Sequence, residues 1–169
     1  MSTIHFKFLH RLLGILILLI FNNTAFAQED SLLLDGIDGK KHRLTEYIGK
    51  GKWAIVNVWA TDCPTCRREL FDLVSFHDEH QDKDAIVVGL TLDLESFGVP
   101  NKAYVSNFSS TYLINYPVLL VSGELASKVI GKSITTVPIT FFYNPKGVLV
   151  YQLRGEVTQQ VLEDIIKNK

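Results

Sequence analysis

Two residues of this chain have the type and spacing for redox chemistry: Cys63 and Cys66, separated by Pro64 and Thr65. One turn of helix brings two residues at this spacing within the Cα separation of about 4.4–6.8 Å that a disulfide requires. They are the only cysteines, so any disulfide within the chain must join them. The pair is therefore predicted to form and break a disulfide reversibly.

The two cysteines are expected to differ in reactivity. Cys63 falls near the N-cap of a predicted helix, where unpaired N–H groups and the helix dipole favour an anion, so its thiol pKa should lie below the free value of about 8.5. Pro64 suits the first helical turn, where its missing N–H costs nothing. Cys66, one turn further and more buried, should keep its proton longer. We predict that Cys63 is the nucleophile and that Cys66 resolves the mixed disulfide.

Other uses of a cysteine pair remain as alternatives. A zinc half-site would need further Cys or His ligands, and an inert structural disulfide normally closes a longer loop. A copper carrier that holds the metal through both thiolates, or a redox-sensing adaptor, is chemically suitable. The only methionine is Met1, so thioether ligands give the copper alternative no support.

The elements around the pair indicate a parallel unit. Residues 53–60 form an almost continuous apolar run, typical of a strand buried on both faces, and residues 85–91 form a second. Between them, from Pro64 to about His80, apolar residues recur at helical spacing. Strand, helix and strand in this order predict two parallel strands joined by a right-handed crossover.

The remaining pattern predicts an α/β fold with a mixed central sheet flanked by helices. Near the N-terminus, the pattern predicts a β-hairpin extension with strands at 32–34 and 42–44 around an Asp-Gly-rich turn. The other expected elements are helices at 100–113, 124–130 and 158–167, a strand at 116–121, and an antiparallel hairpin of residues 138–143 and 148–153.

The N-terminus has the features of a signal peptide. Lys7 and Arg11 precede an apolar run, residues 12–21, and Ala25-Phe26-Ala27 offers small residues at the positions that a signal peptidase reads. We predict cleavage after Ala27, which divides the chain into a signal peptide, 1–27, and one domain, 28–169. An uncleaved membrane anchor is the alternative, but the run is about ten residues, short of the roughly 20 that span a bilayer.

Composition and net charge limit the classes of molecule that the chain is expected to bind. The chain is 47% hydrophobic and 21% charged, which suits one globular domain. Cleavage would remove two of the 17 basic side chains and none of the 18 acidic ones, leaving 15 and 18 and a formal charge of −3. This balance argues against nucleic acid or an anionic membrane surface as a partner. Export would place the cysteines in an oxidising compartment, where a reduced pair must be actively maintained.

Four features carry a family resemblance: residues 56–61 before the Cys-Pro-Thr-Cys motif, Glu69 after it, Val137-Pro138, and Gly147 in the final hairpin. From about residue 32 to residue 167 the chain resembles the thioredoxin superfamily, and within it the exported TlpA/ResA/CcmG (DsbE) branch of thiol-disulfide oxidoreductases. The Cys-Pro-Thr-Cys motif is similar to that of the cytochrome c maturation member.

The resemblance implies roles for residues outside the motif. Pro138 is expected to be a cis proline that faces the cysteines, and Val137 to offer backbone groups to an extended substrate. Independently of the resemblance, Trp59 is interpreted as packing within the sheet, or as lining the substrate groove because it is close in sequence to the cysteines. Glu69 would help Cys66 lose its proton, although spacing alone makes it a solvated helix residue. Asn57 replaces the buried aspartate of ordinary thioredoxins, which shifts proton handling toward Glu69.

Two residues depart from the family pattern. Asp62 stands where tryptophan is usual, and its carboxylate should raise the pKa of Cys63 and make the couple more reducing than a tryptophan version. With Pro64 and Thr65 it is expected to modulate the pair. Thr136 replaces the usual glycine before Val137.

Three other polar residues are interpreted without a catalytic role. His77 and His80 are assigned to the polar face of the long helix rather than to a metal site, and Asp93 to a loop. No metal is predicted, and no cofactor other than the Cys63–Cys66 disulfide.

Together these observations predict an exported, periplasmic thiol-disulfide oxidoreductase, soluble and monomeric once processed. By resemblance it would reduce selected protein disulfides, apocytochrome c among the candidates, and would receive electrons from a membrane-borne thiol reductant. A periplasmic oxidant is the alternative within the same enzyme class, because the sequence does not give the reduction potential.

Overall fold

The computed structural model describes residues 32–93 and 102–169. The predicted signal peptide, residues 1–27, and its cleavage site after Ala27 lie outside the described residues, as does the predicted start of the helix at 100. Within the described ranges no helix has the length and apolar character needed to cross a membrane.

A seven-stranded mixed sheet organises the fold, in the order β2-β1-β5-β4-β3-β6-β7. Its centre is the predicted parallel pair, in register from Trp53 opposite Ala85 to Trp59 opposite Thr91. The pair β4 and β5 is also parallel, whereas β6 runs antiparallel to β3 and β7 antiparallel to β6. The predicted mixed sheet and C-terminal hairpin are thus confirmed. The strands are β3 (Trp53–Trp59), β4 (Ala85–Thr91), β5 (Val118–Leu120), β6 (Ile139–Tyr143) and β7 (Leu149–Arg154).

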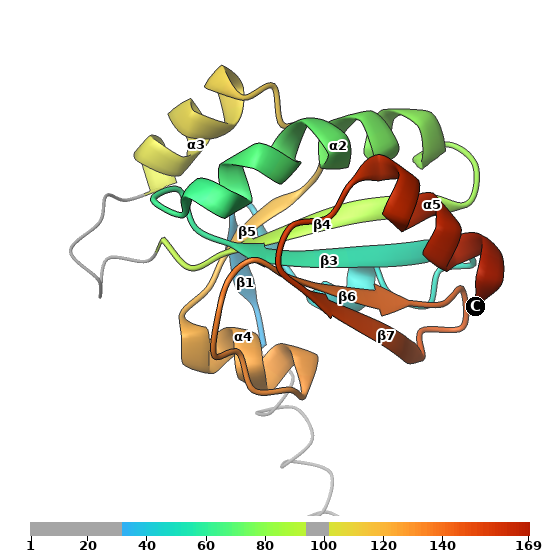
Figure 1. The fold of residues 1–169 in the computed structure, drawn as a ribbon. Helices are drawn as coiled ribbons and strands as arrows, with labels where there is room; N and C mark the ends of the chain where they lie inside the picture. Colours follow the sequence, from blue (N-terminus) through green and yellow to red (C-terminus); the bar gives the residue numbers. More distant parts are fainter. Residues whose placement is uncertain (1–31, 94–101) are drawn as a thin grey trace, which may run out of the picture. The chain divides into compact units, whose positions relative to one another are not determined.

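Helices cover both faces of this sheet (Figure 1). They are α2 (Pro64–His80), α3 (Lys102–Thr111), α4 (Gly123–Ile130) and α5 (Gln159–Asn168). One apolar cluster joins the sheet to α2, α3 and α5, and a second joins the opposite face to α4. Every residue of β3 is buried because both of its faces are covered, which explains its continuous apolar sequence.

The helix α2 has the bounds that the sequence predicts. Leu70, Leu73 and Phe76 form its buried face. His77 corrects the prediction of a polar face, because it is 4% exposed and its Nδ1 accepts a hydrogen bond from the backbone N–H of Val87 at 3.0 Å. Burial lowers the pKa of His77, in keeping with a neutral ring that can accept this bond.

The N-terminal hairpin exists, but its first strand lies two residues later than predicted and its return strand ends two residues earlier. Its strands are β1 (Leu34–Gly36) and β2 (Lys41–His42), and β1 also pairs with β5. The turn begins later and is shorter because Asp38 accepts a hydrogen bond from the Lys40 N–H at 3.0 Å and Gly39 takes the left-handed φ of 91°. The return strand ends before residue 44, where the 3-10 helix η1 (Leu44–Glu46) begins.

Candidate active site

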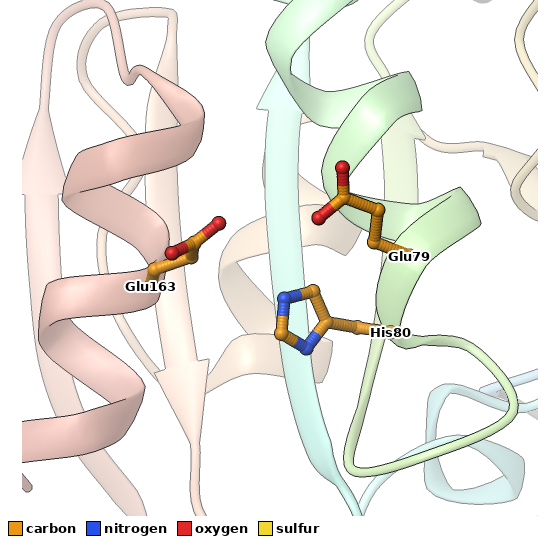
Figure 2. Close-up of side chains that lie close together, drawn as sticks. All are labelled: Glu79, His80 and Glu163. Atoms are coloured by element: carbon orange, nitrogen blue, oxygen red, sulfur yellow. The ribbon is translucent and has the colours of Figure 1, made fainter.

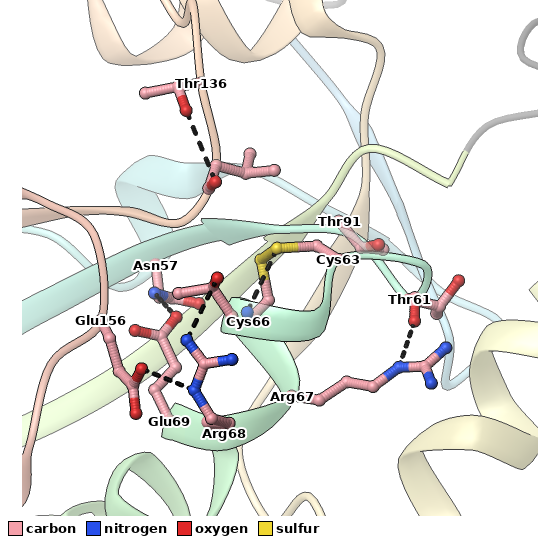
Figure 3. Close-up of a disulfide and its surroundings, with 12 residues drawn as sticks. Asn57, Thr61, Cys63, Cys66, Arg67, Arg68, Glu69, Thr91, Thr136 and Glu156 are labelled. Carbon is pink, nitrogen blue, oxygen red and sulfur yellow. Dashed lines mark hydrogen bonds and ion pairs between the residues drawn. A yellow bond between two sulfur atoms is a disulfide. The ribbon is translucent and has the colours of Figure 1, made fainter.

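Cys63 and Cys66 form a disulfide at the carboxyl end of β3, where the chain turns into α2 (Figure 3). Their Cα atoms are 5.3 Å apart, within the range expected from the spacing. The pairing predicted from the cysteine count is confirmed. The disulfide therefore lies at the edge of the sheet where the strand ends, and Cys63 is its partly exposed member.

The two cysteines differ in position and in exposure, as predicted. Cys63 is the N-cap of α2, with extended backbone angles of φ −86° and ψ 109°, and is partly exposed. Its Sγ accepts a hydrogen bond from the backbone N–H of Cys66 at 3.1 Å. The same N–H would stabilise a thiolate after reduction, because helix N-termini favour negative charge. Cys66 is fully buried, so an incoming substrate meets Cys63 first.

Glu69 lies one helical turn after Cys66 and has no exposed surface, so the solvated position that spacing alone suggests is wrong. Its Oε1 accepts a hydrogen bond from Asn57 Nδ2 at 2.9 Å, and its Oε2 accepts one from the Val157 backbone N–H at 3.0 Å. Burial raises the pKa of Glu69 to about 7, although both hydrogen bonds oppose the rise. Near neutral pH this carboxyl can therefore either take up or release a proton.

Asn57 connects Glu69 to the sheet. Its side-chain N–H groups reach Glu69 and the Thr140 Oγ1, the latter at 3.0 Å, so they link α2, β3 and β6. Among the described residues its Oδ1 has no hydrogen-bond partner. The sequence assigned Asn57 only a supporting place, and the structure makes it the direct partner of Glu69.

Asp93 is a site residue that the sequence reasoning missed, because its assignment to a loop implied exposure. It is 3% exposed and accepts hydrogen bonds from the Thr61 N–H at 2.9 Å, from the Thr61 hydroxyl at 2.8 Å and from the Thr91 hydroxyl. It thereby ties the end of β4 to the residue two positions before Cys63. The predicted parallel strands could have indicated this contact, because the carboxyl ends of adjacent parallel strands lie side by side and bring Thr61 near Asp93.

The peptide bond between Val137 and Pro138 is cis, as the family resemblance implied. Val137 packs against both apolar clusters, one of which contains Cys66, and the exposed Thr136 lies in the surroundings of the disulfide (Figure 3). The role of Val137 and Pro138 in binding substrate stays a prediction.

Trp59 does not fit the predicted place in a substrate groove. It has no exposed surface, and its ring packs on Phe108 with centroids 5.6 Å apart. Its Nε1 would lie 2.8 Å from a Cβ atom at position 89, so the indole occupies space that only Gly89 leaves free. The alternative interpretation, packing within the sheet, is the one that the structure supports.

The residues predicted to modulate the pair lie at the surface around it. Asp62 and Pro64 are exposed and Thr65 is partly exposed. Arg68 contacts the Thr65 Oγ1 at 3.3 Å and forms an ion pair with Glu156 at 2.9 Å. Effects of Asp62, Pro64 and Thr65 on the redox couple stay predictions.

Comparisons with known proteins agree with this geometry. The profile of the AhpC/TSA family matches residues 25–152. Thiol-disulfide oxidoreductase ResA of Bacillus subtilis strain 168 is 25% identical over 89% of this chain and 87% of its own length. Sporulation thiol-disulfide oxidoreductase A of the same strain is 28% identical, with coverage of 91% and 95%.

Solved structures give the same result. A crystal structure of a thioredoxin-family thiol:disulfide interchange protein from Chlorobium tepidum TLS has a TM-score of 0.67 and 27% identity, covering 80% of this chain and 90% of that one. The predicted thioredoxin-like fold is therefore confirmed.

Proposed function

We propose that this chain, which belongs to the AhpC/TSA family and is a thiol-disulfide oxidoreductase, acts outside the cytoplasm to reduce selected protein disulfides. One observation supports the catalytic part of the proposal: a partly exposed sulfur at a helix N-cap is bonded to a buried sulfur, which lies one turn from a buried carboxyl. This arrangement separates an attacking thiol, a resolving thiol and a proton acceptor. It uses no cofactor other than its own disulfide.

The first step is attack by Cys63. In the reduced protein its thiolate, facing the Cys66 N–H, attacks one sulfur of a substrate disulfide. The substrate S–S bond breaks, a mixed disulfide forms between Cys63 and the substrate, and the other substrate sulfur leaves as a thiolate that takes up a proton.

The second step is resolution by Cys66. Cys66 is buried, so its thiol needs a nearby base, and Glu69 with a pKa of about 7 can accept that proton at neutral pH. The Cys66 thiolate then attacks the Cys63 sulfur and releases the second substrate sulfur. Two electrons have passed to the substrate, and the pair is left as the disulfide seen in the structure.

The surroundings of the disulfide suggest how a substrate is held. The segment from Thr136 to Pro138 lies outside the ladder of β6 and carries the cis peptide bond. We assign to Val137 the backbone contacts to an extended substrate strand, a common way of binding peptides.

Export, a membrane-borne electron donor, a monomeric mature chain and apocytochrome c as a substrate are parts of the same proposal. The N-terminal pattern supports export, and the Cys-Pro-Thr-Cys motif supports the cytochrome c substrate. Fractionation of cells that express the full chain, with mass spectrometry of the purified product, tests export. A periplasmic product that begins at Gln28 is expected, and a cytoplasmic product with an intact N-terminus would contradict it.

Insulin reduction by the purified mature chain tests the catalytic role. Wild type should catalyse the reaction and Cys63→Ser should not. Equal rates for the two proteins would contradict the proposal. Cys66→Ser should stall at the mixed disulfide, so expression of this variant should trap covalent substrates. A reduction potential of about −120 mV for the Cys63–Cys66 pair would instead support a role as an oxidant of protein thiols.

A further inference from the structure

His80, the last residue of α2, is held in one orientation. Its Nδ1 lies 2.7 Å from an oxygen of Asp84, and its ring stacks on Phe76 with centroids 4.3 Å apart. A carboxylate at Nδ1 fixes the proton there and leaves Nε2 with a free lone pair. Histidines that bind metals in proteins are commonly oriented in this way.

Two carboxylates face this imidazole from different helices. Glu79 precedes His80 on α2, and Glu163 lies on α5 (Figure 2). The three side chains offer ligand atoms that all lie within 4.8 Å of one another. Figure 2 shows the ring nitrogen remote from the backbone pointing between the two carboxylates.

We propose that Glu79, His80 and Glu163 bind one zinc ion. One imidazole nitrogen and two carboxylates are donors that zinc takes at about 2.0–2.2 Å, with water in the remaining position. The two carboxylates balance the charge of the ion. The imidazole favours zinc over calcium and magnesium, which prefer oxygen ligands.

The present hydrogen-bond partners of Glu163 are weak enough for a zinc ion to replace them. Lys167 Nζ lies 3.0 Å from one carboxylate oxygen, and Gln159 Nε2 lies 3.2 Å from the other. Lys167 is 61% exposed, and such surface pairs are weak, so a divalent cation can displace the ammonium group.

A bound ion would join the C-terminal end of α2 to α5. These helices already meet through Asp72, whose Oδ1 accepts a hydrogen bond from the Gln159 N–H at 2.9 Å. The chain just before α5 supplies the Val157 N–H that binds Glu69. The zinc site would therefore hold in place the helix that follows this contact. Ligands that bind only the folded state raise its thermal stability.

Calorimetric titration of the oxidised, tag-free mature chain with zinc chloride tests the proposal. The disulfide keeps both sulfurs from acting as ligands, so the test does not depend on the redox function. Wild type should bind one zinc ion and unfold at a higher temperature in its presence. His80→Gln and Glu163→Gln should each weaken binding at least tenfold and remove the thermal shift.

His42→Gln is the matched control. This histidine also has two acidic neighbours, Asp38 at 3.1 Å and Glu46 at 3.3 Å, but each of its ring nitrogens already faces one of them. Zinc binding should be unchanged in this variant. If either helix variant fails to fold, the exposed Glu79→Gln replaces it. Absence of binding by wild type, binding that survives in His80→Gln and Glu163→Gln, or equal loss in His42→Gln would each overturn the proposal.

Discussion

Replacing Glu69 by glutamine should make the unfolding free energy less dependent on pH. Burial raises the pKa of this carboxyl from 4.5 to about 7, which at about 1.4 kcal/mol per unit corresponds to about 3 kcal/mol. Between these two values the folded state binds more protons than the unfolded state. The unfolding free energy therefore falls as the pH rises through that window, and the loss is complete above 7.

Glutamine has no charge to lose, and it has nearly the shape of the protonated acid. Its side-chain oxygen can accept the Val157 N–H. Its amide can donate to Asn57 if that side chain turns over and presents its Oδ1, which has no hydrogen-bond partner among the described residues. The unfolding free energy of Glu69→Gln minus that of wild type should therefore increase by about 3 kcal/mol when the pH is raised from about 4 to about 8.

Urea unfolding of both oxidised proteins at the two pH values measures this gain. Other titrating groups cancel in the difference between variant and wild type. Glu156→Gln is the control, because this acid forms an exposed ion pair with Arg68 and its charge is one of the smaller causes of the raised pKa of Glu69. This variant should change the unfolding free energy by less than about 1 kcal/mol at either pH. A Glu69→Gln difference that is the same at both pH values would refute the assignment of a raised pKa.

Three further outcomes are expected. Asp93→Ala leaves buried donors unpaired and should lower the unfolding free energy, measured by urea titration, by about 2–4 kcal/mol. Asp93→Asn should lose less, and equal losses in the two variants would contradict the hydrogen-bonding role of Asp93. Asp62→Trp should lower the thiol pKa of Cys63 and raise the reduction potential, and unchanged values of both would show that the carboxylate has no influence. Gly89→Ala places a Cβ 2.8 Å from Trp59 Nε1 and should cost about 1–3 kcal/mol, with an altered near-UV spectrum; a native spectrum and unchanged stability would rule out the close contact.

The local pattern of the chain was sufficient for the elements nearest the cysteines. The bounds of α2 and β4, the N-cap position of Cys63 and the disulfide follow from periodicity, from the proline at the first helical turn and from the presence of only two cysteines. These features depend on residues within a few positions of one another, so sequence order carries the information. The hairpin of β1 and β2 was displaced because several Asp and Gly residues offered competing turns.

The sequence by itself therefore determined which atoms can exchange electrons, because thiol chemistry and helix capping are local. Only the tertiary structure decided the surroundings of those atoms. Glu69 is buried by partners 12 and 88 positions away, and Asp93 reaches Thr61 across 32 positions. Trp59 lies in the core and not in a groove for the same reason. Burial and long-range hydrogen bonds depend on how separate elements pack, and these contacts place the proton acceptor and the turn that holds the nucleophile.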